Sequence, residues 1–129
     1  MKIGFTGTQR GMSPSQAAAL RAELSKYSGE FHHGDCIGAD VQAHQIALEL
    51  GYQIHIHPPT DPRKRAFCTG ILYPTKSYMK RNEDIVACTT LLIAAPRSTE
   101  KKSPRSGTWA TIRRANAALL IIWPEGEGR

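Results

Sequence analysis

The stretch MKIGFTGTQRGMSPSQ, residues 1–16, decides the fold, because it combines a strand, a glycine-containing loop and the start of a helix. We expect the strand at about Lys2–Thr6. Ser13 and Gln16 form a predicted capping box with Pro14 at the first helical position, a pattern typical of a helix N-terminus. A strand that passes through such a loop into a helix begins a βαβ unit and indicates a parallel sheet.

The same alternation of strand and helix continues along the chain. Further strands are expected at Glu30–His33, Tyr52–His57, Thr90–Ala95 and Ala118–Trp123. The first helix is expected to end near Ser28, and further helices are expected at Asp40–Leu50, at Ser77–Thr89 and from Ser106 onward. Residues 60–75 contain Pro62 and Pro74 and are expected to be irregular.

This order of elements predicts an α/β fold. We expect a three-layer Rossmann-like sandwich, with a five-stranded parallel sheet of order 3-2-1-4-5, and a single domain over residues 1–129. In that order the chain reverses direction between strands one and four. Ligands of such sheets bind beside this point, at the carboxyl ends of the strands.

Composition excludes several classes of protein. A chain of 129 residues can bury a core without disulfides, and its three cysteines are too widely spaced for a disulfide framework or for zinc-binding pairs. No apolar run approaches the roughly 20 residues of a membrane helix. The first residues form a strand rather than a leader, so we expect a cytoplasmic protein that has no membrane partner.

The sequence predicts neither a metal site nor a cofactor. His55 and His57 lie on the same face of one predicted strand, but no second pair of ligands follows at a diagnostic spacing. None of the loops has the spacing of the common dinucleotide-binding or nucleoside-triphosphate-binding glycine motifs.

The net charge favours an anionic partner. Seventeen Lys and Arg residues against eleven Asp and Glu residues give a formal charge of +6 at pH 7. The basic residues gather in two predicted loops, at 63–65 and at 97–105. The alternative is that both groups are only solvated surface.

Three loops are predicted to meet at the carboxyl edge of the sheet. They are TGTQRGMSP at 6–14, HGDCIGAD at 33–40 and PRSTEKKSPRSGT at 96–108, and each leads into a helix. Backbone N–H groups at a helix N-terminus bind anions, and glycine lets a phosphate approach the backbone closely. Each loop taken alone is also compatible with an ordinary glycine turn, so the prediction of a phosphate site depends on all three converging.

Candidate ligand-binding residues follow from these loops. They are Thr6, Gly7, Thr8, Gln9, Gly34, Asp35, Gly38, Asp40, Ser106, Gly107 and Thr108. Residues of the first loop are candidates for phosphate or base contacts, and residues 106–108 for phosphate contacts. Asp35 follows a strand directly, where a ribose can reach it, whereas Asp40 is better suited to cap its helix.

Four ordered motifs, which span nearly the whole chain, resemble a known family. GFTGTQ at 4–9, HGDCIGADVQAH at 33–44, the pair Arg81 and Asn82, and SGTWATIRRA at 106–115 are similar to the SLOG superfamily. This Rossmann-like group includes the Lonely Guy phosphoribohydrolases and the DNA-processing protein A family. The resemblance implies a nucleotide or nucleotide-derived ligand, adds Arg81 and Asn82 to the ligand-binding residues, and implies a homodimer.

The resemblance also bears on catalysis. The Lonely Guy enzymes carry the pattern G-G-x-G-T-x-x-E, which Gly107 and Thr108 match, but the position of its catalytic Glu is held by Thr111. A hydroxyl cannot replace a carboxylate as general base. If the protein is an enzyme, the implied reaction is hydrolysis of a nucleotide N-glycosidic bond, with Arg81, Asp35 and Glu83 as catalytic candidates and Asp40 as a further acid.

Single-stranded DNA is the second alternative ligand. The segment SGTWATIRRA resembles a motif of DNA-processing protein A. DNA would use the same basic loops for its backbone and aromatic rings for its bases. The chain has nine aromatic residues, and apart from Phe67, Tyr73, Tyr78 and Trp109 most of them belong to the predicted core, so a small nucleotide ligand is favoured.

Overall fold

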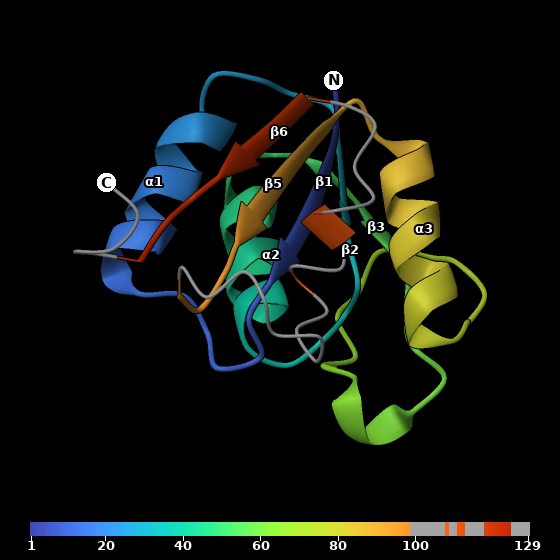
Figure 1. Ribbon diagram of the computed structural model, residues 1–129. Coiled ribbons are helices and arrows are strands. Elements are labelled where there is room, and N and C mark those ends of the chain that lie inside the picture. The colour runs from blue at the N-terminus through green and yellow to red at the C-terminus, as the bar shows by residue number, and fades with distance from the viewer. Residues whose placement is uncertain (99–107, 109–110, 113–117, 125–129) are drawn as a thin grey trace.

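The computed structural model describes residues 1–98, 108, 111–112 and 118–124 (Figure 1). Its centre is a parallel sheet of six strands in the order β4-β3-β2-β1-β5-β6. The strands are β1 (Lys2–Gly7), β2 (Glu30–His33), β3 (Gln53–Ile56), β4 (Ile71–Leu72), β5 (Leu91–Ala95) and β6 (Ala118–Ile121). The five predicted strands and their order 3-2-1-4-5 are confirmed.

The prediction of five strands was nevertheless one short. β4 lies within the segment that proline content marked as irregular, and it pairs with His55 and Ile56 of β3. Two residues are too short to show a strand period, so only the tertiary structure reveals this strand. It adds an edge to the sheet and leaves the predicted order of the other five unchanged.

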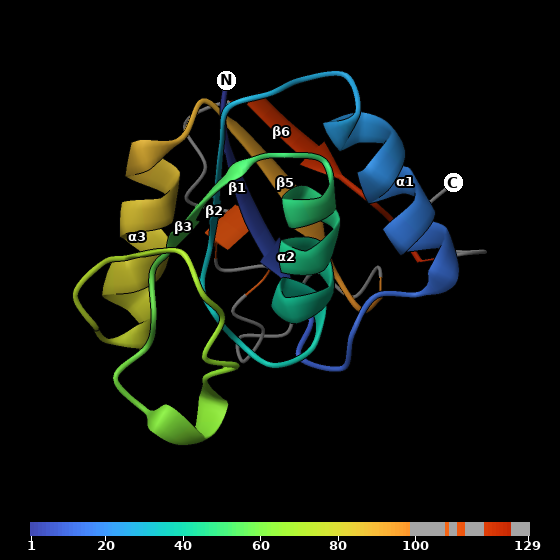
Figure 2. The same cartoon turned by 180° about the vertical axis from the view of Figure 1, so that it is seen from behind.

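Helices cover both faces of the sheet. The helices α1 (Pro14–Leu24) and α2 (Ala39–Glu49) contact each other, and α2 crosses one face, as Figure 2 shows. The helix α3 (Tyr78–Cys88) covers β1 and β2 on the other face. Side chains of β1 alternate between the layers: Ile3 and Phe5 enter the core beneath α1 and α2, whereas Gly4 lies against α3.

Gln16 fixes the start of α1 and also joins distant strands. The predicted capping box is present: Gln16 N donates to Ser13 Oγ over 3.1 Å, and Ser13 N donates to Gln16 Oε1 over 3.0 Å. Gln16 Nε2 then donates to the carbonyl oxygens of Pro96 and Ile122, at 2.7 and 2.9 Å. One buried amide therefore ties α1 to the ends of β5 and β6. The helix ends at Leu24, earlier than the predicted end near Ser28.

The start of α2 differs from the prediction that Asp40 is its cap. The N-cap is Gly38, at φ +94°, without a side-chain hydrogen bond, and Asp40 lies inside the first turn. The Asp40 carboxylate instead accepts a hydrogen bond from Cys36 N over 3.1 Å, which closes the loop before the helix. Gly51 follows the last turn at φ +85°, a left-handed conformation that glycine adopts readily at the end of a helix.

Several predictions fall on residues that the structure does not describe. Within the predicted helix at 106–117, Thr108, Thr111 and Ile112 are helical, and the rest of that segment lies outside the described residues. The same holds for most of the basic loop at 97–105 and for the tail at 125–129. In the described part of the chain, none of the helices has the length and apolar character needed to cross a bilayer.

Candidate ligand-binding cleft

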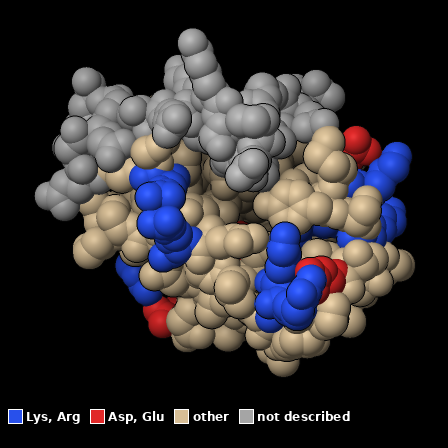
Figure 3. All heavy atoms as spheres, turned by 60° about the horizontal axis from the view of Figure 1, so that its bottom comes forward, with Lys and Arg blue, Asp and Glu red and all other residues tan. Residues whose placement is uncertain are grey.

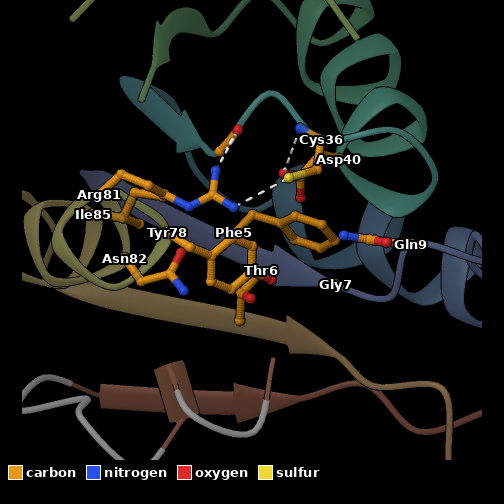
Figure 4. Close-up of a pocket in the computed structure, with 11 residues that line it drawn as sticks. Phe5, Thr6, Gly7, Gln9, Cys36, Asp40, Tyr78, Arg81, Asn82 and Ile85 are labelled. Carbon is orange, nitrogen blue, oxygen red and sulfur yellow. Dashed lines mark hydrogen bonds between the residues drawn. The ribbon is translucent and has the colours of Figure 1, made fainter. Parts of the chain in front are cut away.

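A cleft opens at the carboxyl ends of β1 and β2, between the loops that follow them and the first turns of α3 (Figure 4). The empty space between its lining residues is about 270 Å³ with open solvent included, and the part that can hold a water-sized molecule is about 10 Å³. Its lining consists of Phe5, Thr6, Gly7, Gln9, Gly34, Cys36, Asp40, Tyr78, Arg81, Asn82 and Ile85. The first two predicted loops and the Arg–Asn pair therefore meet in one place.

Four lining residues were not predicted. Tyr78 and Ile85 stand one helical turn before and after Arg81 and Asn82, so the helical period applied to that pair would have found them. Cys36 lies between the two glycines of the second loop. Phe5 contributes the edge of a core ring, which nothing in its sequence context marks.

Two predicted residues join the loops instead of lining the cleft. The carbonyl oxygen of Thr8 accepts hydrogen bonds from Gly11 N at 3.1 Å and from Ala39 N at 3.0 Å. Gly38 lies so close to the backbone of Gln9 that a Cβ there would overlap the Gln9 carbonyl oxygen. Both contacts hold the first loop against the start of α2.

Asp35 positions a neighbouring segment. Its side chain is fully buried, Oδ2 accepts from Arg65 Nε at 2.9 Å, and Oδ1 accepts from Cys68 N at 2.8 Å. Its backbone has φ +56°, a left-handed conformation that aspartate tolerates better than most residues. Both carboxylate oxygens are thus directed at residues 65–68, and Asp35 is not part of the cleft lining.

The other catalytic candidate among the acids, Glu83, also lies away from the cleft. Its side chain is exposed on α3 and forms an ion pair with Lys80 at 3.7 Å, within the same helix. Helical geometry explains this placement, because a residue two positions after Arg81 points to nearly the opposite side of the helix.

Arg81 is buried, with 3% of its surface exposed, and its guanidinium is held on several sides. Nη1 donates to the carbonyl oxygens of Gly34 and His57, and Nη2 donates to Cys36 Sγ at 3.1 Å, as the dashed lines in Figure 4 show in part. The guanidinium lies 4.6 Å from the centre of the Tyr78 ring. A permanent positive charge is therefore fixed beneath the second loop.

Asp40 provides a carboxyl group in the cleft whose pKa is higher than usual. Burial raises the pKa of this group to about 6, and the charge of Arg81 opposes the shift. Burial likewise raises the pKa of the neighbouring Cys36, so its thiol stays protonated at neutral pH rather than serving as an activated nucleophile. Among the described residues, Asp40 Oδ1 and Arg81 Nε are buried polar atoms that have no hydrogen-bond partner.

The third predicted loop is described only in part. Ser106 and Gly107 lie outside the described residues, whereas Thr108 is helical and buried. Thr111, at the position of the Lonely Guy glutamate, is also buried, with 1% of its surface exposed.

Lys and Arg side chains project on both sides of the face onto which the cleft opens (Figure 3).

Comparison with known proteins supports the architecture. Neither a family model nor a curated protein matches the sequence. A protein called TM1055, a target of the Northeast Structural Genomics Consortium, has an X-ray structure that matches with a TM-score of 0.63. The match covers 89% of this chain and 68% of that one at 14% identity. This match shows that the chain has a Rossmann-like α/β fold. At this identity the similarity extends to the fold alone.

Proposed function

We propose that the protein is a member of the SLOG superfamily and binds a nucleotide or nucleotide-derived ligand in the cleft. The observation that carries this proposal is the pair of unpartnered buried atoms, Arg81 Nε and Asp40 Oδ1, in residues that line the cleft. Leaving a buried polar group without a partner costs about 1–3 kcal/mol. A polar ligand that supplies the missing hydrogen bonds offsets this cost.

The chemistry around these two atoms suits a nucleotide. Arg81 supplies a fixed positive charge for a phosphate, and the N-terminus of α2 is directed at the same loop. Thr6, Gln9 and Asn82 add a hydroxyl and two amides, which both donate and accept hydrogen bonds. Neutral groups of this kind are suited to the hydroxyls of a ribose and the edge of a base.

Removing the neutral hydrogen-bonding groups of the cleft is expected to weaken binding. Calorimetric titration with nucleoside monophosphates, diphosphates and dinucleotides should identify a ligand class. For that class, Thr6→Val and Asn82→Ala should each raise Kd by about tenfold, which corresponds to one lost hydrogen bond. Thr90→Val, at the opposite end of the sheet, is the matched control and should leave Kd unchanged. A Kd that neither cleft variant changes, or binding of single-stranded DNA alone, would contradict the proposal.

Hydrolysis of an N-glycosidic bond is a second candidate, favoured by the raised pKa of Asp40. A carboxyl group that is partly protonated near neutral pH can donate a proton to a leaving base. Chromatography of the bound nucleotide after incubation should then show free base with the unaltered protein, and at least a hundredfold less with Asp40→Asn at equal occupancy of the site. Intact nucleotide after prolonged incubation would restrict the function to binding.

A further inference from the structure

Three histidines form a stack on the sheet, away from the cleft. His32 of β2 lies beside His55 of β3, with ring centres 4.3 Å apart, and His57 follows at 5.1 Å from His32. They project from the face opposite the aliphatic core, where Cys88 of α3 has its thiol within 4.8 Å of the nearest imidazole nitrogens of His32 and His57. Nitrogen and sulfur ligands therefore converge from β2, from the residue that follows β3 and from α3.

Hydrogen bonds show which imidazole nitrogens carry a lone pair that a metal could use. A neutral imidazole has one N–H and one lone pair, so a partner at one nitrogen fixes the role of the other. In the described part of the chain, three groups of side chains bring together three atoms that could bind one metal ion. They are His33–His44–Cys68, Glu30–His32–His55 and His32–His57–Cys88.

The group around His33 is committed to an internal hydrogen-bond chain. His33 Nδ1 accepts from Asp35 N over 2.9 Å, so its proton resides on Nε2, which donates to His44 Nδ1 over 3.0 Å. The lone pair of the fully buried His33 is already used, and the ring has none left for an ion. Burial lowers the pKa of His33 to about 3, which keeps the ring neutral within this chain of hydrogen bonds.

The group around His55 is committed in a similar way. His55 Nδ1 lies 2.9 Å from the Tyr73 hydroxyl, and Nε2 lies 2.9 Å from Gln53 Oε1. The carboxylate of Glu30 in turn receives His32 Nε2–H over 2.9 Å. Both ring nitrogens of His55 and Nε2 of His32 are thus engaged by neighbouring side chains.

The remaining group, His32–His57–Cys88, has the arrangement of a metal site. Because His32 Nε2–H donates to Glu30, the lone pair of His32 is on Nδ1, which accepts a hydrogen bond from His57 Nε2–H over 2.8 Å. A carboxylate that orients an imidazole from behind is a recurring feature of metal-binding histidines. Asp84 stands one helical turn before Cys88 and contributes negative charge near both His57 and Cys88.

We propose that His32 Nδ1, His57 Nε2 and Cys88 Sγ bind one Zn²⁺ ion or a similar borderline-soft divalent metal. Binding requires His57 to carry its proton on Nδ1, and Cys88 to release its thiol proton to solvent as the metal–sulfur bond forms. Around one tetrahedral zinc the ligand atoms lie about 3.3–3.7 Å apart. The ion takes the place of the proton between His32 Nδ1 and His57 Nε2, which are 2.8 Å apart without it, so the two rings must separate by about 0.5 Å and the half-buried Cys88 must rotate toward them. Water takes the fourth position.

The three ligand residues of this site lie outside the cleft lining, although the carbonyl oxygen of His57 accepts a hydrogen bond from Arg81 of the cleft. Arg81 and Asn82, which line the cleft, lie in the first half of α3, whereas Cys88 is its last residue. An ion bound there fastens the end of α3 to β2 and β3. The inference therefore stands independently of the proposed nucleotide ligand, and its test uses no nucleotide.

Titration of the protein with Co²⁺ tests the proposal, because a cobalt ion bound by thiolate gives a charge-transfer band in the near ultraviolet. The unaltered protein should show this band together with visible bands of tetrahedral cobalt, and Zn²⁺ should abolish both. Cys88→Ser should lose the charge-transfer band and weaken binding at least tenfold. Cys68→Ser is the matched control, since Cys68 belongs to the excluded group around His33, and it should retain the band.

A second variant keeps the test decisive if Cys88→Ser fails to fold. Glu30→Gln alters a partly exposed side chain and leaves all three ligands in place, so it should retain the band and weaken cobalt binding about tenfold. Glu23→Gln, on α1, should have no effect on the cobalt affinity. Absence of the charge-transfer band in the unaltered protein, its persistence in Cys88→Ser, or its loss in Cys68→Ser would overturn the proposal.

Discussion

Lowering the pH from 7 to 4.5 is expected to destabilise the protein by about 3 kcal/mol, a large part of the stability of an ordinary domain. Two buried histidines produce the effect. Burial lowers the pKa of His33 to about 3 and that of His57 to about 4, from an ordinary value of 6.5. Both rings are therefore mainly neutral in the folded protein throughout this range.

The direction of the effect follows from proton binding. Below pH 6.5 the unfolded chain takes up a proton at each ring, whereas the folded protein does not until pH 3–4. Each ring then costs about 2.6 kcal/mol of stability at pH 4.5 relative to neutral pH. Asp40 acts in the opposite sense. Its raised pKa of about 6 means that, as the pH falls, Asp40 takes up a proton in the folded protein before it does so in the unfolded chain, which adds about 2 kcal/mol to the stability at pH 4.5.

Urea unfolding at pH 7 and at pH 4.5, with a chelator present to remove metal ions, measures this difference. Asp40→Asn is the informative variant, because it removes the opposing contribution. Its loss of stability between the two pH values should grow to about 5 kcal/mol. Equal stability of the unaltered protein at both pH values, or a smaller acid loss in Asp40→Asn, would contradict the assignment of these groups.

Gly38→Ala is expected to be among the most damaging single substitutions, with a loss of about 4 kcal/mol. The backbone at Gly38 has φ +94°, where an alanine is strained, and the added Cβ would overlap the carbonyl oxygen of Gln9. Because that oxygen belongs to the backbone, no side-chain rotation relieves the overlap. The substitution would separate the first loop of the cleft from the second.

Gly51→Ala provides the matched control for Gly38→Ala. Gly51 has a similar φ of +85°, but an added Cβ meets nothing within 4 Å. This variant carries only the backbone strain, about 1 kcal/mol. Comparison of the two by chemical denaturation isolates the contribution of the contact with Gln9. Equal losses in both variants would show that the two loops are not packed as the structure describes.

The sequence predicted the parts of this molecule that depend on local pattern. The strand, loop and capping box in residues 1–16 predicted β1 and α1, and the alternation of elements then predicted the order of five strands. Because parallel strands end at one edge of the sheet, the same reasoning placed Thr6 and Gly34 in one cleft. Arg81 was added to them only by the resemblance of the Arg–Asn pair to the SLOG superfamily.

The features that the sequence did not predict depend on contacts between residues that are far apart in the chain. Asp35 is directed at residues 65–68 because Arg65 and the backbone of Cys68 approach from a loop that the sequence describes only as irregular. The pairing of His32 with His57 depends on the register of β2 against β3, and Cys88 reaches them from α3, further along the chain. No spacing motif in the sequence encodes such a meeting of distant side chains.

The proposed nucleotide site is tested most directly by amide chemical shifts of ¹⁵N-labelled protein during titration with a nucleotide. A nucleotide bound in the cleft should cause the largest changes at Gly7, Gly34, Cys36 and Asn82, together with the side-chain Nε–H of Arg81. The amides of β4 and of the exposed end of α2 should change little. Saturable shifts confined to other parts of the molecule, or no shifts with any nucleotide at millimolar concentration, would contradict the central claim.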